Sequence, residues 1–446
     1  MRIATDPHPL QKQRFGWYMY DWANSAFSVT ILAALFGPYL DKVVVPAGGY
    51  VLPLIGTTPL SATSLYGYAL GISAFAVLLS SPVLGAIADA GSSRKRFMAV
   101  FAILGSTASA LFFFVGQGDV ALALGLFLVA NFSFVSGNVF YDSFLPHLAG
   151  PDEQDAVSAR GYAYGYAGGG LLFILHLLLV QFHDAVGISD VTMALRISLG
   201  SVGLWWAGFS LVTFHHLRED HNDGVRQSWS ALAKAGFARV ARTAGIVGKM
   251  RQLVLFLLAF MVYNDGIQTV IAMATVYGSD ELHFDTLTLM GCLLMVQLVG
   301  VAGSQMFARI SKRTGTKNAI LLSLLIWTAV VVYAYFMSQP FEFWILGGVV
   351  GLVLGGSQAL SRSLYSSIIP VEAAAEFFGF FSVFEKFSAI WGPIVFAVVR
   401  QTTGSSRDSI ISLVVFFLVG GIALLFLNLK SARAESAVLA DKIAGV

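Results

Sequence analysis

The sequence is short of charged residues and has a single cysteine. Charged residues make up 12% of the chain and hydrophobic residues 57%, whereas a soluble globular protein is about 25% charged. The chain therefore has the composition of a protein surrounded by lipid. Its one cysteine, Cys292, excludes a disulfide within these residues, and the apolar residues around it indicate a small buried side chain.

The sequence also lacks the motifs of enzymes and of ATP-driven pumps. No segment matches the phosphate-binding loop G-x-x-x-x-G-K-[ST], and no His-x-x-x-His pair or cysteine cluster indicates a metal site. We therefore expect no enzymatic activity, no cofactor, and no nucleic-acid or obligate protein partner. The first apolar stretch, residues 16–40, is too long for the core of a cleavable signal peptide, so we expect it to stay as a membrane span.

Twelve hydrophobic runs come close to the ~20 residues with which a helix crosses a bilayer. They lie at 16–40, 64–88, 97–115, 120–144, 161–182, 194–216, 252–278, 286–310, 318–337, 341–365, 379–400 and 408–430. Arg and Lys gather after the second, sixth and eighth runs, and the loops of the opposite side contain few of them. The positive-inside rule then predicts a multi-pass protein of the inner cell membrane with both termini in the cytoplasm.

The chain divides into two similar halves of six runs each, residues 1–216 and 251–446, joined by a linker at 217–250. Run 4 ends in YDSFLP and run 10 ends in YSSIIP. Glycines spaced four residues apart in runs 5 and 10 allow close packing of membrane helices. Six plus six runs with internal similarity predict an all-α membrane protein of two six-helix bundles, the architecture of many secondary transporters.

The linker carries apolar residues near helical spacing between Trp229 and Val247, interleaved with Lys and Arg. This pattern is typical of an amphipathic helix on the inner leaflet, with its basic residues toward anionic headgroups. A solvated basic linker that only joins the two halves is an equally good interpretation.

The loop after run 2 reads GAIADAGSSRKR at 85–96. It resembles the loop signature of the major facilitator superfamily, except that no basic residue follows the Asp directly. A carboxylate at a helix end beside basic residues can lock one bundle against the other on the cytoplasmic side. The gating candidates here are Asp89, Arg94, Lys95 and Arg96. The alternative is that the basic residues only set the topology.

Other segments resemble one family of that superfamily more specifically. They are YDWANSA at 20–26, NDGIQT at 264–269, GGSQALSRS at 355–363 and EFFG at 376–379. Together they are similar to the vacuole effluxer-like family, named for a fungal vacuolar exporter of amino acids. The resemblance covers nearly the whole chain and implies the major facilitator fold, with amino-acid efflux as the activity.

The second half contains a loop that corresponds to residues 85–96. It reads KRTGTK at 312–317, so it keeps the basic turn and lacks the Asp.

Two carboxylates interrupt hydrophobic runs at matching places, Asp21 in run 1 and Asp265 in run 7. An ionisable group at the centre of a membrane helix costs roughly 2.5–3.5 kcal/mol or more. Asp265 lies about 20 Å along its run and Asp21 only about 8 Å along its own. We therefore expect Asp265 to line a cavity near mid-bilayer and to bind substrate or a proton. A cap or gate is an equal alternative for Asp21, and a packed structural role remains open for both.

Further polar residues share these runs. The candidates for binding a substrate or proton, besides the two carboxylates, are Asn24, Asn138, Tyr263, Gln268 and Gln358. The resemblance implies that runs 1, 4, 7 and 10 line the central cavity. Amides, carboxylates and the aromatic rings of these runs suit a small amphipathic or zwitterionic solute.

Ion pairs are expected where the cytoplasmic ends of the runs meet. Asp142 ends run 4 and Arg160 opens run 5, and Arg362 near the end of run 10 can reach Glu376 or Glu385. We take these as gate salt bridges, with purely structural ion pairs as an even alternative. In run 5, His176 can carry a proton at physiological pH, but a packing role is the favoured interpretation.

These patterns predict a secondary active transporter that moves a small organic solute, an amino acid or a similar molecule, by alternating access. Proton coupling is the expected energy source. A facilitator for sugars, nucleosides or peptides is the alternative within transport. A solute receptor that does not transport is the alternative from another class.

Overall fold

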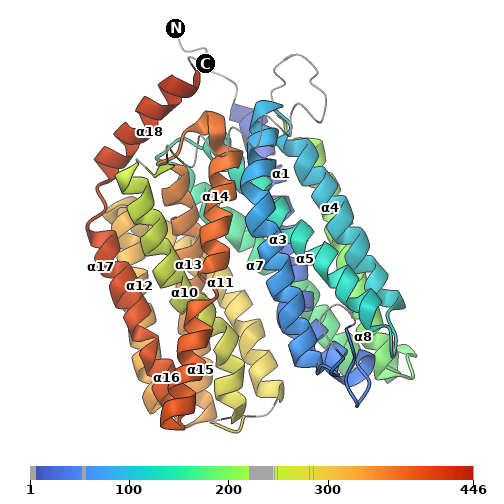
Figure 1. The fold of residues 1–446 in the computed structure, drawn as a ribbon. Helices are drawn as coiled ribbons and strands as arrows, with labels where there is room; N and C mark the ends of the chain where they lie inside the picture. Colours follow the sequence, from blue (N-terminus) through green and yellow to red (C-terminus); the bar gives the residue numbers. More distant parts are fainter. Residues whose placement is uncertain are drawn as a thin grey trace. The chain divides into compact units, whose positions relative to one another are not determined.

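The computed structural model describes residues 7–52, 57–219, 245, 247, 248, 250–280, 282–284 and 286–444. Within these residues the regular elements are all helices, apart from one isolated β-bridge between Tyr50 and Leu60. Twelve spans of this part are long and apolar enough to cross a membrane, which confirms the predicted all-α membrane protein. Figure 1 shows the helices in chain order by colour.

The first six spans follow the predicted runs closely. They are α1 (Pro7–Ala26) continuing through η1 (Phe27–Leu35), α2 (Phe36–Tyr39) and η2 (Leu40–Val44); α3 (Ala62–Ala90); α4 (Arg94–Leu111) with η3 (Phe112–Phe114); α5 (Val120–Ser143) with α6 (Leu145–Leu148); α7 (Gln154–Gln181), followed by the short η4 (Asp184–Val186); and α8 (Val191–His216). The segment η1 is a π-helix of nine residues, a rare form that often marks a functional position in a helix.

In the last six spans, spans 11 and 12 each consist of more than one helix. The six are α10 (Arg251–Asp280), α11 (Thr286–Thr314), α12 (Thr316–Phe336), α13 (Pro340–Ser366), the pair α14 (Ala374–Phe387) and α15 (Trp391–Thr403) after η5 (Val371–Ala373), and α16 (Ser406–Ser412) with α17 (Val414–Leu425). The helix α18 (Leu429–Ala444) follows them. Span 11 is interrupted between Phe387 and Trp391, so that a new helix begins inside the span (Figure 1).

The chain forms two compact units that do not follow the two halves of the sequence. Unit 1 consists of Met1–Ser80, Arg94–Tyr141 and Tyr164–Asp220. Unit 2 consists of His221–Val446 together with two segments of the N-terminal half, Ser81–Ser93 and Asp142–Ala163. The predicted boundaries at 216 and 251 stay a prediction. The expected linker helix lies mostly outside the described residues, with Val247 as a buried exception.

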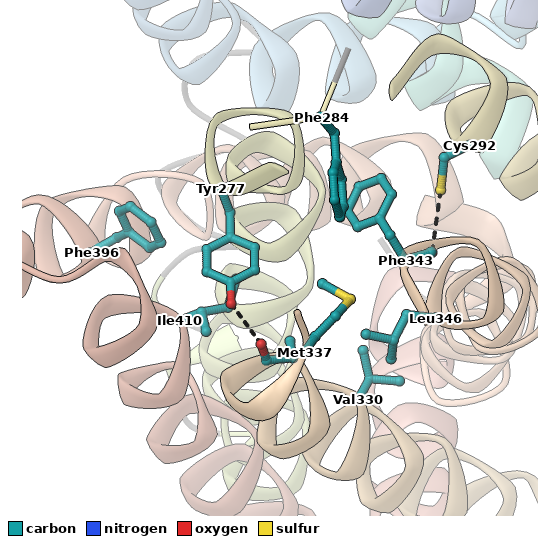
Figure 2. Close-up of a cluster of buried hydrophobic side chains, with 10 residues drawn as sticks. Tyr277, Phe284, Cys292, Val330, Met337, Phe343, Leu346, Phe396 and Ile410 are labelled. Carbon is teal, nitrogen blue, oxygen red and sulfur yellow. Dashed lines mark hydrogen bonds between the residues drawn. The ribbon is translucent and has the colours of Figure 1, made fainter. Parts of the chain in front are cut away.

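A cluster of buried apolar side chains forms part of the core of unit 2 (Figure 2). It includes Cys292, which is buried as the sequence predicted. The Tyr277 hydroxyl donates to the carbonyl of Ala334 at 2.7 Å, so this aromatic ring enters the apolar core with its polar end bonded. Most of its residues also line an apolar pocket of about 100 Å³.

Candidate functional site

Asp21 in α1 belongs to unit 1 and is partly buried. Its carboxylate accepts hydrogen bonds from the hydroxyl of Tyr141 at 3.1 Å and from that of Ser25, one turn along α1, at 3.4 Å. The backbone of α7 comes close at Gly165, where an added Cβ would lie 3.0 Å from Asp21 Oδ1. The side chain is thus held by hydroxyl groups of α1 and α5, next to a glycine of α7.

One turn beyond Asp21, an amide pair joins the same helices. Asn24 Nδ2 donates to Asn138 Oδ1 at 2.6 Å, and Asn24 is buried. The structure therefore brings Asp21, Asn24 and Asn138 together at the α1–α5 contact. His176 is also buried, with its ring nitrogens 3.1 Å from Thr30 Oγ1 in the π-helical segment and 2.8 Å from Ser201 Oγ.

Asp265 in α10 belongs to unit 2 and is 2% exposed. Its carboxylate accepts hydrogen bonds from the backbone N–H of Gly392 at 2.9 Å and of Trp391 at 3.2 Å. These are the first two residues of α15, so Asp265 caps the helix that begins at the break in span 11. A carboxylate at a helix N-terminus is favourable because the free N–H groups carry partial positive charge.

Neighbours of Asp265 on α10 also contact the break. Asn264 Nδ2 donates to Ser388 Oγ at 2.5 Å, and Ser388 lies between α14 and α15. An added Cβ at Gly392 would lie 1.9 Å from Thr269 Oγ1, so Thr269 packs directly on the α15 backbone. Asn264, Asp265 and Thr269 of α10 thus all contact the break between α14 and α15.

The remaining binding candidates of unit 2 lie on α10 and α13. The hydroxyls of Tyr263 and Ser361 are 2.7 Å apart, and both residues are buried. Gln268 and Gln358 are each half-buried. The structure thus brings Tyr263 on α10 into contact with α13.

Arg362 in α13 has a different partner from the one predicted. Its Nη1 donates to Asp142 Oδ1 at 2.9 Å, and its Nε and Nη2 donate to the hydroxyl and carbonyl of Ser158 at 2.9 Å each. Its guanidinium also lies 4.2 Å from the centre of the Tyr162 ring, a cation–π contact. The sequence had assigned Arg362 to a glutamate and Asp142 to Arg160.

The pair of Asp142 and Arg362 joins two helix ends that lie far apart in the chain. Asp142 and Arg362 lie near the ends of α5 and α13, which both belong to unit 2 at these residues, and a guanidinium can bond several acceptors in one plane. Arg160 is exposed, and Glu385 is half-buried on α14. Sequence spacing pairs neighbours in the chain, but the fold brings together residues 220 positions apart.

Asp89, at the end of α3, caps another helix start within unit 2. Its carboxylate accepts from the backbone N–H of Glu376 at 2.8 Å and of Ala375 at 3.3 Å, both in the first turn of α14. The backbones approach closely beside it, because an added Cβ at Gly85 would lie 2.3 Å from the carbonyl oxygen of Ala375. The carboxylate therefore holds α3 and α14 together through main-chain donors.

The basic turn after α3 is held by an acidic residue that sequence reasoning missed. Glu219, just after α8, accepts from the backbone N–H of Arg94 at 2.8 Å and of Lys95 at 2.9 Å, and its carboxylate is 3.4 Å from Arg94 Nε. Glu219 thus caps the start of α4 within unit 1. Arg96 is exposed. The gating role of these three basic residues stays a prediction.

A second missed residue is Asp155 in the first turn of α7. Its Oδ2 accepts from the hydroxyl of Thr316 at 2.7 Å, and its Oδ1 accepts from the hydroxyl of Ser363. Neither Asp155 nor Glu219 lies in a motif. The partners of Asp155 are 161 and 208 positions away along the chain, and those of Glu219 are 125 and 124 positions away. Local spacing carries no signal for such contacts.

These sites consist of carboxylates, amides and one guanidinium that bond to helix ends and to each other. Across the part of the chain that the structure describes, no group of three or more His, Cys, Asp or Glu side chains is placed to bind a metal ion. The carboxylates at helix starts and the partly buried pair of Asp142 and Arg362 are contacts whose strength depends on charge. They suit a protein that changes conformation when charge or contacts change.

Comparisons with known proteins show the family to which this chain belongs and its fold. The family model described as "Vacuole effluxer Atg22 like" matches residues 10–437. A protein of Bacillus subtilis (strain 168), described as the uncharacterized MFS-type transporter YxiO, is 33% identical over 416 residues, which are 93% of this chain and 94% of that protein. Autophagy-related protein 22-1 of Penicillium rubens is 23% identical and covers 99% of this chain and 94% of its own length.

Solved structures show the same fold at low sequence identity. The human organic anion transporter MFSD10 (TETRAN) matches with a TM-score of 0.65 at 16% identity, covering 93% of this chain and 99% of that one. The proton:xylose symporter XylE matches with a TM-score of 0.69 at 11% identity, covering 96% and 98%. The fold is the major facilitator fold, and the chain is a multi-pass membrane transporter. It belongs to the vacuole effluxer Atg22-like family of the major facilitator superfamily.

Proposed function

We propose that this protein is a secondary active transporter that moves an amino acid or a similar small solute by alternating access, driven by protons. The observation that carries the coupling part is Asp265. It is a buried carboxylate near the middle of a membrane span, and its two hydrogen bonds go to the start of a helix inside a second span.

Protonation of Asp265 has a direct mechanical consequence in this geometry. An ionised carboxylate makes hydrogen bonds about twice as strong as a neutral group does, and it also interacts with the helix dipole. A bound proton removes that charge and weakens the hold of α10 on α15. A proton would then be coupled to the position of α15, which a proton-driven conformational cycle needs.

The solute class is supported by polar side chains found within each of the two units. Asn24 and Asn138 offer amides, and Gln268 and Gln358 are half-buried. Carboxylates and amides match the ammonium and carboxylate ends of an amino acid. The family description names a vacuole effluxer, which supports export as the direction. We place both termini in the cytoplasm from the distribution of Arg and Lys.

The solute is tested by reconstitution into liposomes. Radiolabelled amino acids, dipeptides, nucleosides and sugars are offered with and without a pH gradient. We expect accumulation of at least one amino acid against its gradient, and its loss with an uncoupler. Accumulation of a sugar or nucleoside alone would reject the amino-acid proposal, and transport that ignores the pH gradient would reject proton coupling.

The role of Asp265 is tested by Asp265→Asn, with Asp21→Asn as the matched control in the other half. We expect Asp265→Asn to abolish accumulation driven by the pH gradient while exchange of solute across the membrane continues, because exchange needs no net proton movement. Asp21→Asn should keep gradient-driven accumulation. Normal accumulation by Asp265→Asn at wild-type abundance would remove Asp265 from the coupling mechanism.

A further inference from the structure

The apolar pocket of unit 2 is separate from the residues proposed to bind the solute. It is lined by side chains of α10, α11, α12, α13 and α16, with a volume of about 100 Å³. The four binding candidates of unit 2, all within the described part of α10 and α13, lie outside its lining: Tyr263, Asp265, Gln268 and Gln358. The chemistry of the lining itself therefore decides which kind of molecule the pocket accepts.

The two polar side chains in the pocket lining are both bonded to the main chain. The hydroxyl of Tyr277 donates to the carbonyl of Ala334 at 2.7 Å, and the thiol of Cys292 donates to the carbonyl of Phe343 at 3.7 Å (Figure 2). The other lining side chains are apolar. Such a lining offers water no partner, and an apolar cavity of about 150 Å³ in another protein stays dry but takes up benzene or xenon. The pocket thus favours hydrocarbon over water or an amino acid.

Unit 1 has a place that corresponds to the pocket and is marked by the same kind of hydrogen bond. The hydroxyl of Tyr39, at the end of span 1, donates to the carbonyl of Val115, at the end of span 3, at 2.7 Å. Tyr277 of span 7 makes the same bond to the end of span 9. Spans 1 and 3 hold the same places among the first six spans that spans 7 and 9 hold among the last six.

Arginines bind the ends of the same two spans. Arg196 in the first turns of α8 donates to the carbonyl of Phe113 at the end of span 3, at 2.6 Å. Arg407 at the start of α16 donates to the carbonyl of Tyr335 at the end of span 9, at 2.8 Å. These arginines open spans 6 and 12, so the two places correspond in a second pair of contacts as well.

Aromatic rings fill this place in unit 1. The ring of Phe36 stacks on that of Phe127 with their centres 4.8 Å apart, and both side chains are fully buried. Phe36 stands three positions before Tyr39, whereas the residue three positions before Tyr277 is Ala274, which lines the pocket. Unit 2 thus has a methyl group where unit 1 has a ring, and the pocket lies beside it.

The depth of the pocket indicates where its ligand comes from. Cys292 stands six residues after Thr286, the first residue of α11, and so lies about 9 Å along this helix. The hydrocarbon core of a bilayer is about 30 Å thick, so this depth falls among the acyl chains of one leaflet. Leu289, Leu293 and Val296 line the pocket and are only half-buried, so the pocket reaches the surface of α11.

We propose that this pocket binds an acyl chain of a membrane lipid, which fills unit 2 as the aromatic rings fill unit 1. A hydrocarbon chain suits the lining because it has no polar group, and it is the most abundant apolar molecule at this depth. A ligand that binds only the folded state stabilises it, so the stability of unit 2 depends on the bilayer. The proposal does not depend on the transported solute or on proton coupling.

The single cysteine of the chain reports on the occupant directly. The protein is reconstituted into phosphatidylcholine liposomes in which a small fraction of the lipid carries a diazirine in the middle of one acyl chain. After illumination, mass spectrometry of peptides locates the attached lipid. Cys292 is 6% exposed, so attachment there requires a chain inside the pocket, whereas Leu298 on the same helix is 49% exposed and requires none. We expect attachment at both residues in the parent protein.

The variant Ala274→Leu fills the pocket, and its matched control is Ala272→Leu, which adds the same group at an exposed position of α10. We expect Ala274→Leu to lower attachment at Cys292 on the order of tenfold, the effect of displacing about two buried methylene groups. Attachment at Leu298 should not change, and Ala272→Leu should alter neither. Attachment at Leu298 alone in the parent protein, or equal attachment at Cys292 in the two variants, would overturn the proposal.

Thermal unfolding separates loss of the pocket from loss of the fold. Phosphatidylcholine added to delipidated protein in detergent should raise the unfolding temperature of Ala272→Leu more than that of Ala274→Leu, by on the order of 2 °C. If Ala274→Leu does not fold, Ala334→Val fills the pocket from α12 and takes its place. Benzene that raises the unfolding temperature of a parent protein without attachment at Cys292 would assign the pocket to small apolar molecules and reject the lipid chain.

Discussion

The carboxylates of the two halves lie in similar surroundings but have different partners. Each has a hydroxyl residue four positions along its helix, Ser25 after Asp21 and Thr269 after Asp265. Each also faces a glycine of another span, Gly165 or Gly392, where an added Cβ would come within about 3 Å of the carboxylate.

Asp21 and Asp265 differ in the groups that donate hydrogen bonds to them. Asp21 is partly buried and accepts from the side chains of Tyr141 and Ser25, whereas Asp265 is buried and accepts from the main chain at a helix start. Side-chain donors can rotate away or be exchanged by mutation. Main-chain donors at a helix start are fixed to the helix, so a change at Asp265 acts on the whole of α15.

The largest effect is expected from Gly392→Ala. The new Cβ would lie 1.9 Å from Thr269 Oγ1 and 2.8 Å from Asp265 Oδ1, and overpacking of this kind costs about 3 kcal/mol. Thermal unfolding in detergent measures this loss, and we expect a strong fall in the unfolding temperature. The matched Gly165→Ala meets the flexible Ser25 Oγ at 2.7 Å and should cost about 1 kcal/mol. Equal falls in the unfolding temperature of Gly392→Ala and Gly165→Ala would contradict this difference between the two sites.

Removal of charge should also affect the halves unequally. Asp265→Asn weakens two bonds to main-chain N–H groups, for which we expect a loss of about 2 kcal/mol in the free energy of unfolding. Asp21→Asn should cost about 1 kcal/mol or less, because its hydroxyl donors can turn to other acceptors. Unfolding of both variants in urea and detergent measures the difference, and a larger loss for Asp21→Asn would contradict it.

Tyr141→Phe tests the hydroxyl group that donates to Asp21. It removes the 3.1 Å hydrogen bond to Asp21 and keeps the ring that stacks on Trp17 at 4.3 Å. We expect a loss of about 1 kcal/mol, measured by the same unfolding experiment. In the double variant Tyr141→Phe with Asp21→Asn, the loss in the free energy of unfolding should be smaller than the sum of the two single losses. Both substitutions affect the same hydrogen bond between Tyr141 and Asp21. Full additivity would show that the two side chains do not interact.

The smallest effect is expected from Ser25→Ala. Its hydrogen bond to Asp21 is long, at 3.4 Å, so the loss should be no more than about 0.5 kcal/mol. Transport should remain close to wild type in the liposome assay. A loss as large as that of Tyr141→Phe would mean that the Ser25 hydroxyl is a principal partner of the carboxylate.

Much of the fold follows from the sequence, but the break in span 11 was missed. Residues 379–400 are apolar enough to pass for one continuous helix. A signal was present, because Gly392-Pro393 stands just after the break, and Pro is favoured in the first turn of a helix. Membrane helices tolerate Gly and Pro, so this pair alone does not separate a break from a continuous span.

The candidate residues were chosen because a polar or charged side chain inside a membrane span is energetically unfavourable. The sequence did not predict which residues they contact. Asp265 is buried and Asn24 bonds to Asn138, which fits both a binding role and a packed structural role, so their binding roles stay predictions. The pairing of Arg362 with Asp142 was not predicted, and Asp155 and Glu219 were overlooked. Each of these carboxylates acts on a helix or side chain more than a hundred positions away, where no periodicity connects the two.

The sequence by itself determined the number of spans and the family, because bilayer thickness sets the length of each apolar run and the family's segments are local strings. Only the tertiary structure decided what the carboxylates do. Asp89, Asp265 and Glu219 each cap a helix that begins elsewhere in the chain, and Asp155 binds the start of another. The free N–H groups of a helix start exist only once the helix has formed and packed, so a carboxylate can find them only in the folded protein.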